Sequence, residues 1–268
     1  LLGTLSLKTM LNQGYQKTFA VGTIASAGTL GILIPPSIML VIMADQLSLS
    51  VGDLFMGALL PGLLLGVLYL IYILIYAAMN PKAAPLLPDR QPVSWRTATH
   101  ALKTMAPLFG LIIAVLGSIF AGIATVTEAS GIGALGSILL ASYFRNLNFK
   151  VISDVTKSTF TTTAYIFAIL VGATCFSLVL RELGGDELIE TAFTAVNFGP
   201  YGVIAIILFV VFLLGFFLDW IEITLIVLPL VAPIVTSLGF KIDAHGVVDQ
   251  PELIWFVMLI AIALQTSF

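Results

Sequence analysis

Residues 22–37 read Gly-Thr-Ile-Ala-Ser-Ala-Gly-Thr-Leu-Gly-Ile-Leu-Ile-Pro-Pro-Ser, inside an apolar segment that is long enough to span a membrane. Gly22, Gly28 and Gly31 weaken a helix here, and the pair Pro35–Pro36 removes two backbone donors. Lipid cannot satisfy the carbonyls that are left over, so such a break persists only where protein covers it or where it lines a cavity. Secondary transporters build ion and substrate sites from broken helices. The stretch therefore predicts a membrane transporter.

The composition is that of an integral membrane protein. Of the 268 residues, 59% are hydrophobic and 9% are charged, whereas a soluble domain carries about 25% charged residues. The mean hydropathy is +1.12. The single cysteine, Cys175, excludes an intrachain disulfide. Both ends stop inside apolar segments, and no signal peptide is recognisable, so we expect a fragment of a longer chain.

The apolar segments predict an all-α, polytopic membrane protein. They fall at 18–43, 54–78, 105–126, 129–144, 159–180, 201–218, 221–239 and 253–268, and residues 1–12 add part of another. A full span needs roughly 20 apolar residues. The segments 129–144, 201–218 and 221–239 are therefore short for complete spans.

Charge sorting orients the chain. The basic loops should be cytoplasmic by the positive-inside rule. Their basic residues are Lys8 and Lys17 before the first long span, Lys82, Arg90, Arg96 and Lys103 in the loop 79–104, and Arg145, Lys150 and Lys157 in the loop 145–158. The alternate loops are acidic and should be external; they carry Asp45, Asp53, Glu182, Asp186, Glu187, Glu190, Asp243, Asp249 and Glu252. The loop 79–104 is proline-rich and reads as a cytoplasmic linker with an interfacial helix near 95–103, or as an ordinary connection.

The segments 201–218 and 221–239 are joined only by Asp219-Trp220, and both of their outer flanks are acidic. The tip carries no basic residue, which a cytoplasmic turn would usually offer. The pattern favours a re-entrant hairpin over 201–239, with two full spans as the alternative.

Two regions of the chain resemble each other. Residues 2–15 lead into the broken segment 18–43, and residues 225–240 lead into 253–268, which ends in polar Gln265-Thr266-Ser267. Each region consists of an apolar half-helix, a Gly-aromatic pair that ends it, a polar loop, and a span whose residues become small and polar along its length. The first loop is basic and the second is acidic, so the copies would face opposite sides of the membrane. Such inversion is typical of secondary transporters.

The motifs resemble one known family. They are Ala-Gly-Thr-Leu-Gly-Ile-Leu-Ile-Pro-Pro-Ser-Ile (27–38), Leu-Leu-Pro-Gly-Leu-Leu-Leu-Gly (59–66), Thr-Val-Thr-Glu-Ala (125–129), Gly-Phe-Phe-Leu-Asp (215–219) and Leu-Pro-Leu-Val-Ala-Pro-Ile (228–234). Across nearly the whole chain they look like the large membrane subunit of tripartite ATP-independent periplasmic (TRAP) transporters, the DctM-like family. Trp220 departs from the pattern, because many members have Pro after the aspartate.

The resemblance implies a sodium-coupled elevator-type importer of small organic anions in a bacterial or archaeal inner membrane. The anion would be a C4-dicarboxylate or another carboxylate, such as a sialic or sugar acid. A periplasmic binding protein would deliver it, and a small membrane subunit would support the transport subunit; no nucleic acid is involved. The N-terminal repeat would cover 1–78, the linker 79–104, and the C-terminal repeat 105–268, with the broken helix of 253–268 truncated. The tip of the first hairpin would precede Leu1.

Sodium takes about five or six oxygen ligands, and broken helices supply carbonyls and hydroxyls. The candidates around the first break are Ser26, Gly28, Thr29, Pro35, Pro36 and Ser37; those at the second segment are Gln265, Thr266 and Ser267. Of these, we expect Ser26, Gly28, Thr29, Thr266 and Ser267, together with Asp219, to hold Na⁺. The alternative for each hydroxyl is helix packing through small residues.

Intramembrane acids are functional candidates because a buried charge is costly. Asp219, beside Gly215 at the hairpin tip, is a sodium ligand, a helix cap, or both. Glu128, beside Thr127, either partners a helix N-terminus or contacts substrate or ion. For Glu222 the alternatives are exposure to water and contact with a partner chain. Within the spans only Arg181, at an external end, is basic, so half-helix N-termini and bound sodium would have to attract an anion.

Three other readings compete. A stand-alone divalent-anion or citrate-type sodium symporter would share the broken helices and would need no binding protein. An intramembrane enzyme is disfavoured because no Ser-His, Asp-pair or His-Glu-x-x-His arrangement falls in a span. A channel would give uncoupled flux, which the hairpin repeat argues against. The acidic outer loops 182–190 and 243–252 either dock a binding protein or are simply solvated.

Overall fold

The computed structural model describes residues 3–85, 95–185, 188, 189, 191, 199–240, 242 and 248–267, and within them every regular element is helical. Five helical stretches of this part are long and apolar enough to cross a membrane; they are Lys17–Gln46, Val51–Met79, Leu102–Phe120, Phe149–Glu182 and Trp220–Ser237. Helices Gly199–Leu214 and Pro251–Ser267 are apolar but shorter. The prediction of an all-α membrane protein is confirmed at this level.

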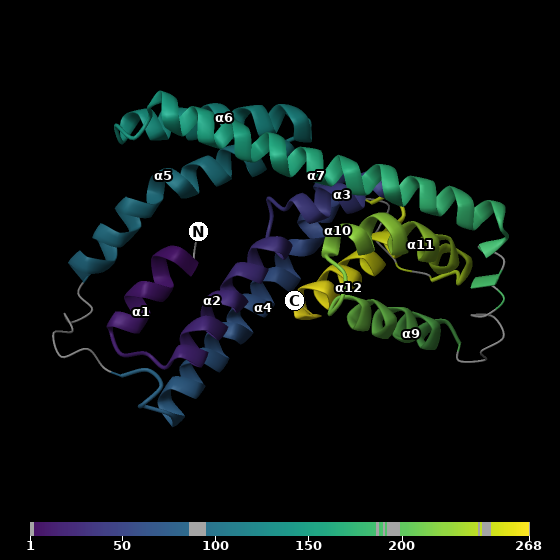
Figure 1. The fold of residues 1–268 in the computed structure, drawn as a ribbon, viewed down its shortest axis with the longest axis horizontal. Coiled ribbons are helices and arrows are strands. Elements are labelled where there is room, and N and C mark those ends of the chain that lie inside the picture. Colours follow the sequence, from purple (N-terminus) through teal and green to yellow (C-terminus); the bar gives the residue numbers. More distant parts are fainter. Residues whose placement is uncertain are drawn as a thin grey trace. The chain divides into compact units, whose positions relative to one another are not determined.

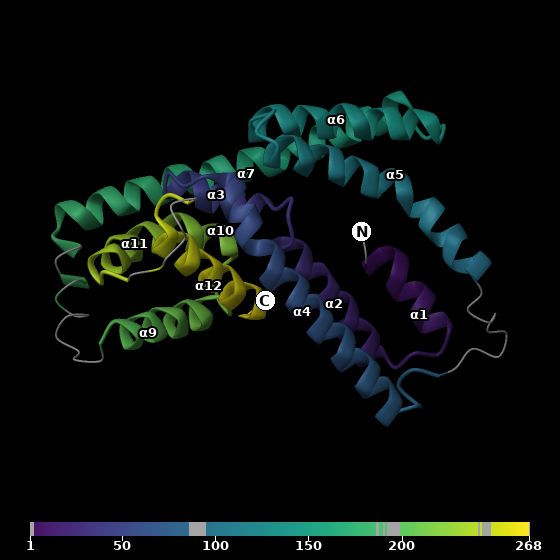
Figure 2. The same cartoon turned by 180° about the vertical axis from the view of Figure 1, so that it is seen from behind.

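Two compact units form, and each is built from two separate stretches of the sequence. The first comprises Leu1–Pro36 and Leu59–Arg145, and the second comprises Ser37–Ala58 and Asn146–Phe268. The broken segment thus divides at Pro36, where one unit ends and the other begins. Figure 1 labels the elements along the chain, and Figure 2 gives the reverse view.

In the first unit, a short π-helical segment η1 (Gly3–Leu7) continues into α1 (Lys8–Asn12) and packs against α2 (Lys17–Leu33). Helix α4 (Val51–Met79) approaches α2 through two glycines four residues apart. A Cβ on Gly62 would lie 3.0 Å from Ile34 Cγ1, and one on Gly66 would lie 3.4 Å from Leu30 Cδ2. Small residues in this spacing let membrane helices pack closely.

The other pair of the first unit is α5 (Trp95–Phe120) and α6 (Val126–Tyr143). Gly133 and Gly136 of α6 face α5, and a Cβ on Gly136 would collide with Leu111. The sequence predicted a separate interfacial helix near 95–103 and a span over 105–126. Instead one helix runs from Trp95 to Phe120 and ends before the turn at residues 121–124, so both expected boundaries were wrong.

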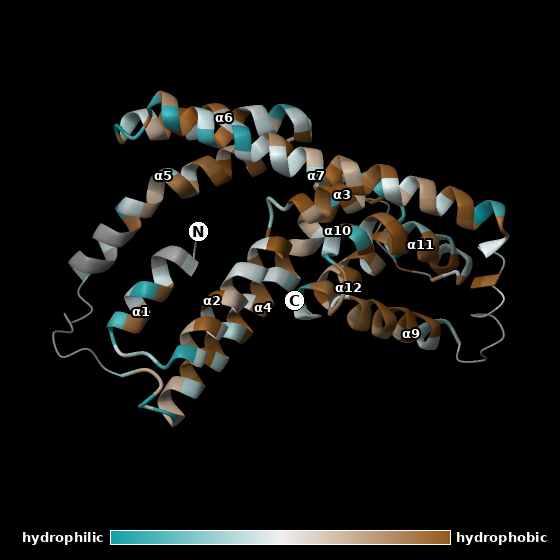
Figure 3. Cartoon of the chain, in the orientation of Figure 1, coloured by the Kyte–Doolittle hydropathy of each residue, from teal (hydrophilic) through white to brown (hydrophobic). Residues whose placement is uncertain are grey.

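The second unit contains α3 (Ile38–Gln46), α7 (Phe149–Glu182), α9 (Gly199–Leu214), α10 (Trp220–Glu222), π-helical η2 (Ile223–Val227), α11 (Leu228–Ser237) and α12 (Pro251–Ser267). Helix α12 packs against α9, α11 and α3, and η2 packs against α3 and α7 (Figure 1, Figure 2). Its helices α9, α11 and α12 are apolar along most of their length (Figure 3).

Helix α7 begins well before the predicted span 159–180. It is 34 residues long, or about 51 Å, and it includes most of the expected loop 145–158. Asn148 starts it by accepting the Val151 N–H at 2.8 Å. The first part alternates apolar residues with charged and hydroxyl residues, among them Lys150, Asp154 and Lys157, and was therefore assigned to a loop. The helix shows that this prediction of a loop was wrong.

Candidate functional site

The break after α2 is made by the two prolines alone. Helix α2 runs without interruption through Gly22, Gly28 and Gly31 to Leu33. Pro35 has no N–H to offer the Gly31 carbonyl, which is its partner in helical spacing. The chain then turns extended at Ile34 (φ −75°, ψ 124°), and Ser37 begins α3 by accepting the Leu40 N–H at 3.4 Å. Buried Ser37 therefore acts as a helix cap beside the break.

The hydroxyls of α2 bond to their own helix. Ser26 Oγ donates to the Gly22 carbonyl at 2.8 Å, and Thr29 Oγ1 donates to the Ser26 carbonyl at 3.1 Å. Gly28 faces open space, since nothing lies within 4 Å of a Cβ built on it. Both hydroxyls thus donate within α2, and sodium ligation by Ser26, Gly28 or Thr29 stays a prediction.

Asp219 caps the second half of the hairpin 201–239. Its carboxylate accepts the Trp220 N–H at 2.8 Å and also the Glu222 N–H, while the Glu222 carboxylate accepts the Asp219 N–H at 3.3 Å. This reciprocal capping box satisfies donors at the helix start. The helix cap, which is one of the two roles expected for Asp219, is therefore present. Ion ligation by Asp219 stays a prediction.

The π-helical turn η2 (Ile223–Val227) follows the cap, and it leaves the carbonyl and hydroxyl oxygens of buried Thr224 without a hydrogen-bond donor from the helix. The Leu228 N–H, which would serve the Thr224 carbonyl in an α-helix, donates to the Ile223 carbonyl instead. The next residue, Pro229, has no N–H. Thr224 is 0% exposed, and its Oγ1 has no hydrogen-bond partner among the residues that the structure describes. Such π-helical turns occur frequently at functional sites.

The hairpin and the second polar segment meet at a glycine. A Cβ on Gly215 would lie 2.7 Å from Ser267 Cβ and would overlap the Ser267 hydroxyl. Ser267 Oγ donates to the Leu264 carbonyl at 2.9 Å, and Thr266 Oγ1 donates to the Ala263 carbonyl at 2.8 Å. Gln265 is buried beside them, with 2% exposure. Gly215 and the polar end of α12, which are far apart in the sequence, thus pack directly against each other.

Glu128 starts α6 in a second capping box. Thr125 Oγ1 accepts the Glu128 N–H at 3.3 Å, and Glu128 Oε2 accepts the Thr125 N–H at 2.7 Å and the Thr125 hydroxyl at 2.8 Å. The backbone N–H and then the hydroxyl of Thr125 hold the pKa of Glu128 below its usual value. The helix-partner role is therefore present; contact of Glu128 or Thr127 with substrate or ion stays a prediction.

The predicted site residues divide between the units. The second unit brings together the elements that carry Ser37, Gly215, Asp219, Gln265, Thr266 and Ser267; the first unit holds Ser26, Gly28, Thr29, Pro35, Pro36, Thr127 and Glu128. Sequence reasoning missed Thr224. A lone hydroxyl in the apolar run 223–228, just before a proline, was the available signal. Of the acidic outer loops, Asp186, Glu187, Glu190 and Asp243 lie outside the described residues.

Comparison with known proteins gives one consistent result. Residues 2–268 match the family described as "Tripartite ATP-independent periplasmic transporter, DctM component". The chain is 32% identical over 259 residues to the C4-dicarboxylate TRAP transporter large permease protein DctM of Vibrio cholerae, covering 89% of this chain and 56% of the relative. It is 31% identical over 231 residues to the ectoine/5-hydroxyectoine TRAP transporter large permease protein UehC of Ruegeria pomeroyi, covering 86% and 53%.

A third relative is the sialic acid TRAP transporter large permease protein SiaM of Vibrio cholerae, which is 26% identical over 247 residues, with 92% of this chain and 57% of the relative covered. The chain thus spans about half the length of the curated relatives that it matches. The substrates that these three proteins are named for differ from one another.

Proposed function

Because this chain belongs to the DctM component family of tripartite ATP-independent periplasmic transporters, we propose that it is part of the transport subunit of a sodium-coupled importer of small organic anions. The family consists of multi-pass transporters of the bacterial inner membrane and not of enzymes. The observation that carries the proposal is the close packing of Gly215 against the Ser267 side chain, which brings the polar end of α12 to the predicted hairpin.

We propose that residues 1–78 and 105–268 are inverted repeats joined by the linker 79–104, of which residues 86–94 lie outside the described part. The two π-helical segments support this arrangement. Segment η1 (Gly3–Leu7) lies a few residues before the stop at Gly14-Tyr15, and η2 (Ile223–Val227) precedes the stop at Gly239-Phe240. Each stop is thus preceded by a π-helical turn, although the two turns lie at different distances from their stops. Elevator movement of the hairpins follows as part of the same proposal.

The coupling ion would be held by oxygens that the broken helices leave available. In the second unit these are the Asp219 carboxylate, the Thr224 carbonyl and hydroxyl, and the hydroxyls of Thr266 and Ser267. In the first unit they are the carbonyls before Pro35–Pro36. Sodium suits neutral oxygens, and a bound cation would offset the cost of leaving buried carbonyls without donors.

The substrate would be a carboxylate delivered by a periplasmic binding protein. A C4-dicarboxylate, ectoine and sialic acid, for which relatives are named, all carry that group. The bound sodium would supply positive potential at the hairpin tip, because the Asp219 and Glu222 carboxylates already occupy the N-terminus of α10. A small membrane subunit would complete the complex, as the tripartite family name implies.

The proposal is tested with the complete protein, its small subunit and its binding protein in proteoliposomes. Uptake of a labelled C4-dicarboxylate, sialic acid and ectoine is measured with an inward sodium gradient and with choline in its place. We expect uptake of one of these solutes to require both sodium and the binding protein. Equal uptake in choline would overturn sodium coupling, and uptake without the binding protein would indicate a stand-alone symporter.

A further inference from the structure

Helices α2 and α4 approach each other beside the proline break, where Gly62 and Gly66 face Ile34 and Leu30. Further along α4, beginning three residues after Gly66, Tyr69, Tyr72 and Tyr76 follow on one face of the helix. Their rings line an opening between α4 and α2.

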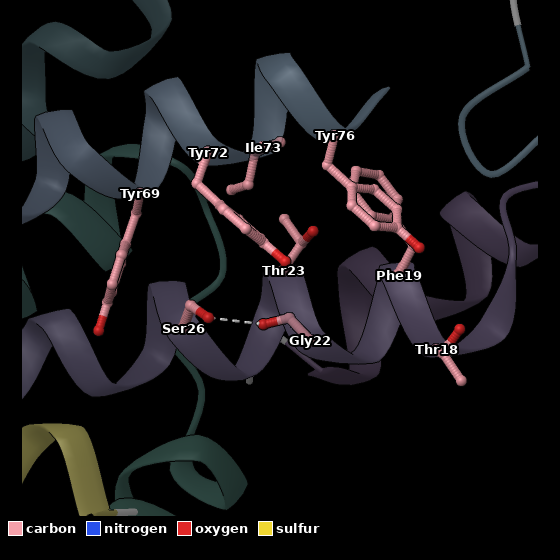
Figure 4. A pocket seen from close by; sticks show the side chains of 9 residues that line it. All are labelled: Thr18, Phe19, Gly22, Thr23, Ser26, Tyr69, Tyr72, Ile73 and Tyr76. Carbon is pink, nitrogen blue, oxygen red and sulfur yellow. Dashed lines mark hydrogen bonds between the residues drawn. The ribbon is translucent and has the colours of Figure 1, made fainter. Parts of the chain in front are cut away.

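This opening is a pocket of about 230 Å³ within the first unit. Figure 4 shows the three tyrosines reaching from α4 across to α2, where Phe19, Gly22 and Ser26 form the opposite wall. The Phe19 and Tyr76 rings stack at 5.3 Å between centroids. From Thr18 to Ser26 the pocket runs along eight residues of α2, or about 12 Å. That length is comparable to one leaflet of the roughly 30 Å hydrocarbon core.

Two lysines flank the outer end of the pocket. The Gln16 N–H donates to the Ala83 carbonyl at 3.0 Å, and Gly14 packs against Pro85. These contacts tie the turn after α4 to the start of α2. Lys17 and Lys82 are the sequence neighbours of Gln16 and Ala83, so both lie where these two segments meet, near the Thr18 end of the pocket. Both side chains are exposed. Positive residues at this end are the ones that the charge pattern assigns to the cytoplasmic surface.

We propose that this pocket binds one anionic phospholipid of the cytoplasmic leaflet. An acyl chain lies between Tyr69, Tyr72 and Gly22, the Tyr76 ring sits at the level of the glycerol, and Lys17 and Lys82 hold the phosphodiester. Aromatic rings with a polar edge prefer the membrane interface, and juxtamembrane lysines attract anionic lipid. The pocket differs from the general lipid-facing surface because its two walls, from α2 and α4, can contact one acyl chain from both sides.

The test uses the complete protein, delipidated in detergent, with phosphatidylglycerol, phosphatidylcholine or inorganic phosphate added. Retained lipid is counted by native mass spectrometry, and the melting temperature is followed in parallel. We expect one phosphatidylglycerol to be retained in preference to phosphatidylcholine. Lys17→Gln and Lys82→Gln should each weaken retention about fivefold. Lys150→Gln makes the same charge change on α7, outside the pocket, and should leave retention unchanged.

A blocking variant separates lipid binding from folding. Nothing lies within 4 Å of a Cβ on Gly22, so Gly22→Leu fits the helix and fills the pocket. It should abolish retention while the lipid-free melting temperature stays the same or rises; Ala25→Leu, an exposed change on the same helix outside the pocket, should do neither. Equal retention of both lipids, retention by Gly22→Leu, a shift produced by inorganic phosphate alone, or no bound lipid at all would each overturn the proposal.

Discussion

Gly215 is the position where one added carbon should do the most damage. A Cβ there would lie 2.7 Å from Ser267 Cβ and would overlap the Ser267 hydroxyl. Both residues are buried, at the junction of the hairpin with α12, so the alanine cannot turn away into solvent. Gly215→Ala must therefore separate α9 from α12 or displace the end of α12.

Overpacking of this kind costs about 1–3 kcal/mol. Gly215 follows the last residue of α9, so the alanine gains no helix propensity to compensate. We expect a lower melting temperature for the complete protein in detergent. Any ligand that depends on this contact should bind roughly 5- to 150-fold more weakly, which sodium titration of uptake would detect.

A second substitution tests the cause. Ser267→Gly removes both atoms that the new methyl meets, so Gly215→Ala combined with Ser267→Gly should be more stable than the sum of the single effects predicts. Gly117→Ala, at a helical glycine with nothing within 4 Å, is the matched control and should be neutral or stabilising. If Gly215→Ala melts and transports like the parent, or the double variant shows no recovery, the packing argument is refuted.

Three further predictions follow from the same structure. Thr224→Val removes a buried hydroxyl without a partner among the described residues, so it should raise the melting temperature by the equivalent of about 1 kcal/mol and, under the proposed function, weaken sodium-dependent uptake; a lower melting temperature would contradict this. Pro35→Ala returns an N–H to the Gly31 carbonyl and should weaken the apparent sodium affinity about tenfold. If the affinity is unchanged, the Gly31 carbonyl is not a sodium ligand. The lowered pKa of Glu128 means that its cap is present above the ordinary carboxyl pKa and lost as pH falls through the lowered value, so an NMR titration should give Glu128 a lower midpoint in the parent than in Thr125→Val.

The position of the main break was predictable because prolines act through the backbone itself. Pro35 and Pro36 remove donors wherever they stand. Glycines act only through propensity, about 1 kcal/mol each, which tertiary contacts can offset. Helix α2 accordingly stays continuous through Gly22 and Gly28, with Ser26 bonded to the Gly22 carbonyl. The glycines were expected to weaken the helix here, and they do not interrupt it.

The candidate site was predictable in its residue types and less so in its contacts. Hydroxyls and acids at membrane depth stand out in an apolar sequence, which identified Asp219, Thr266 and Ser267. That Ser267 faces Gly215 depends on how α12 packs on α9, which no local pattern encodes. Thr224 was missed because a threonine in an apolar run is unremarkable until its hydrogen bonds are counted.

One hydrogen bond separates the π-helical turn at Ile223–Val227 from an ordinary helix. The Leu228 N–H donates to the Ile223 carbonyl, whereas in an α-helix it would donate to the Thr224 carbonyl. Exchanging the two acceptors would rotate the capped start of the helix relative to α11 by about 100° and shift it by about 1.5 Å, the step of one α-helical residue. Asp219 is the side chain that such a change would move.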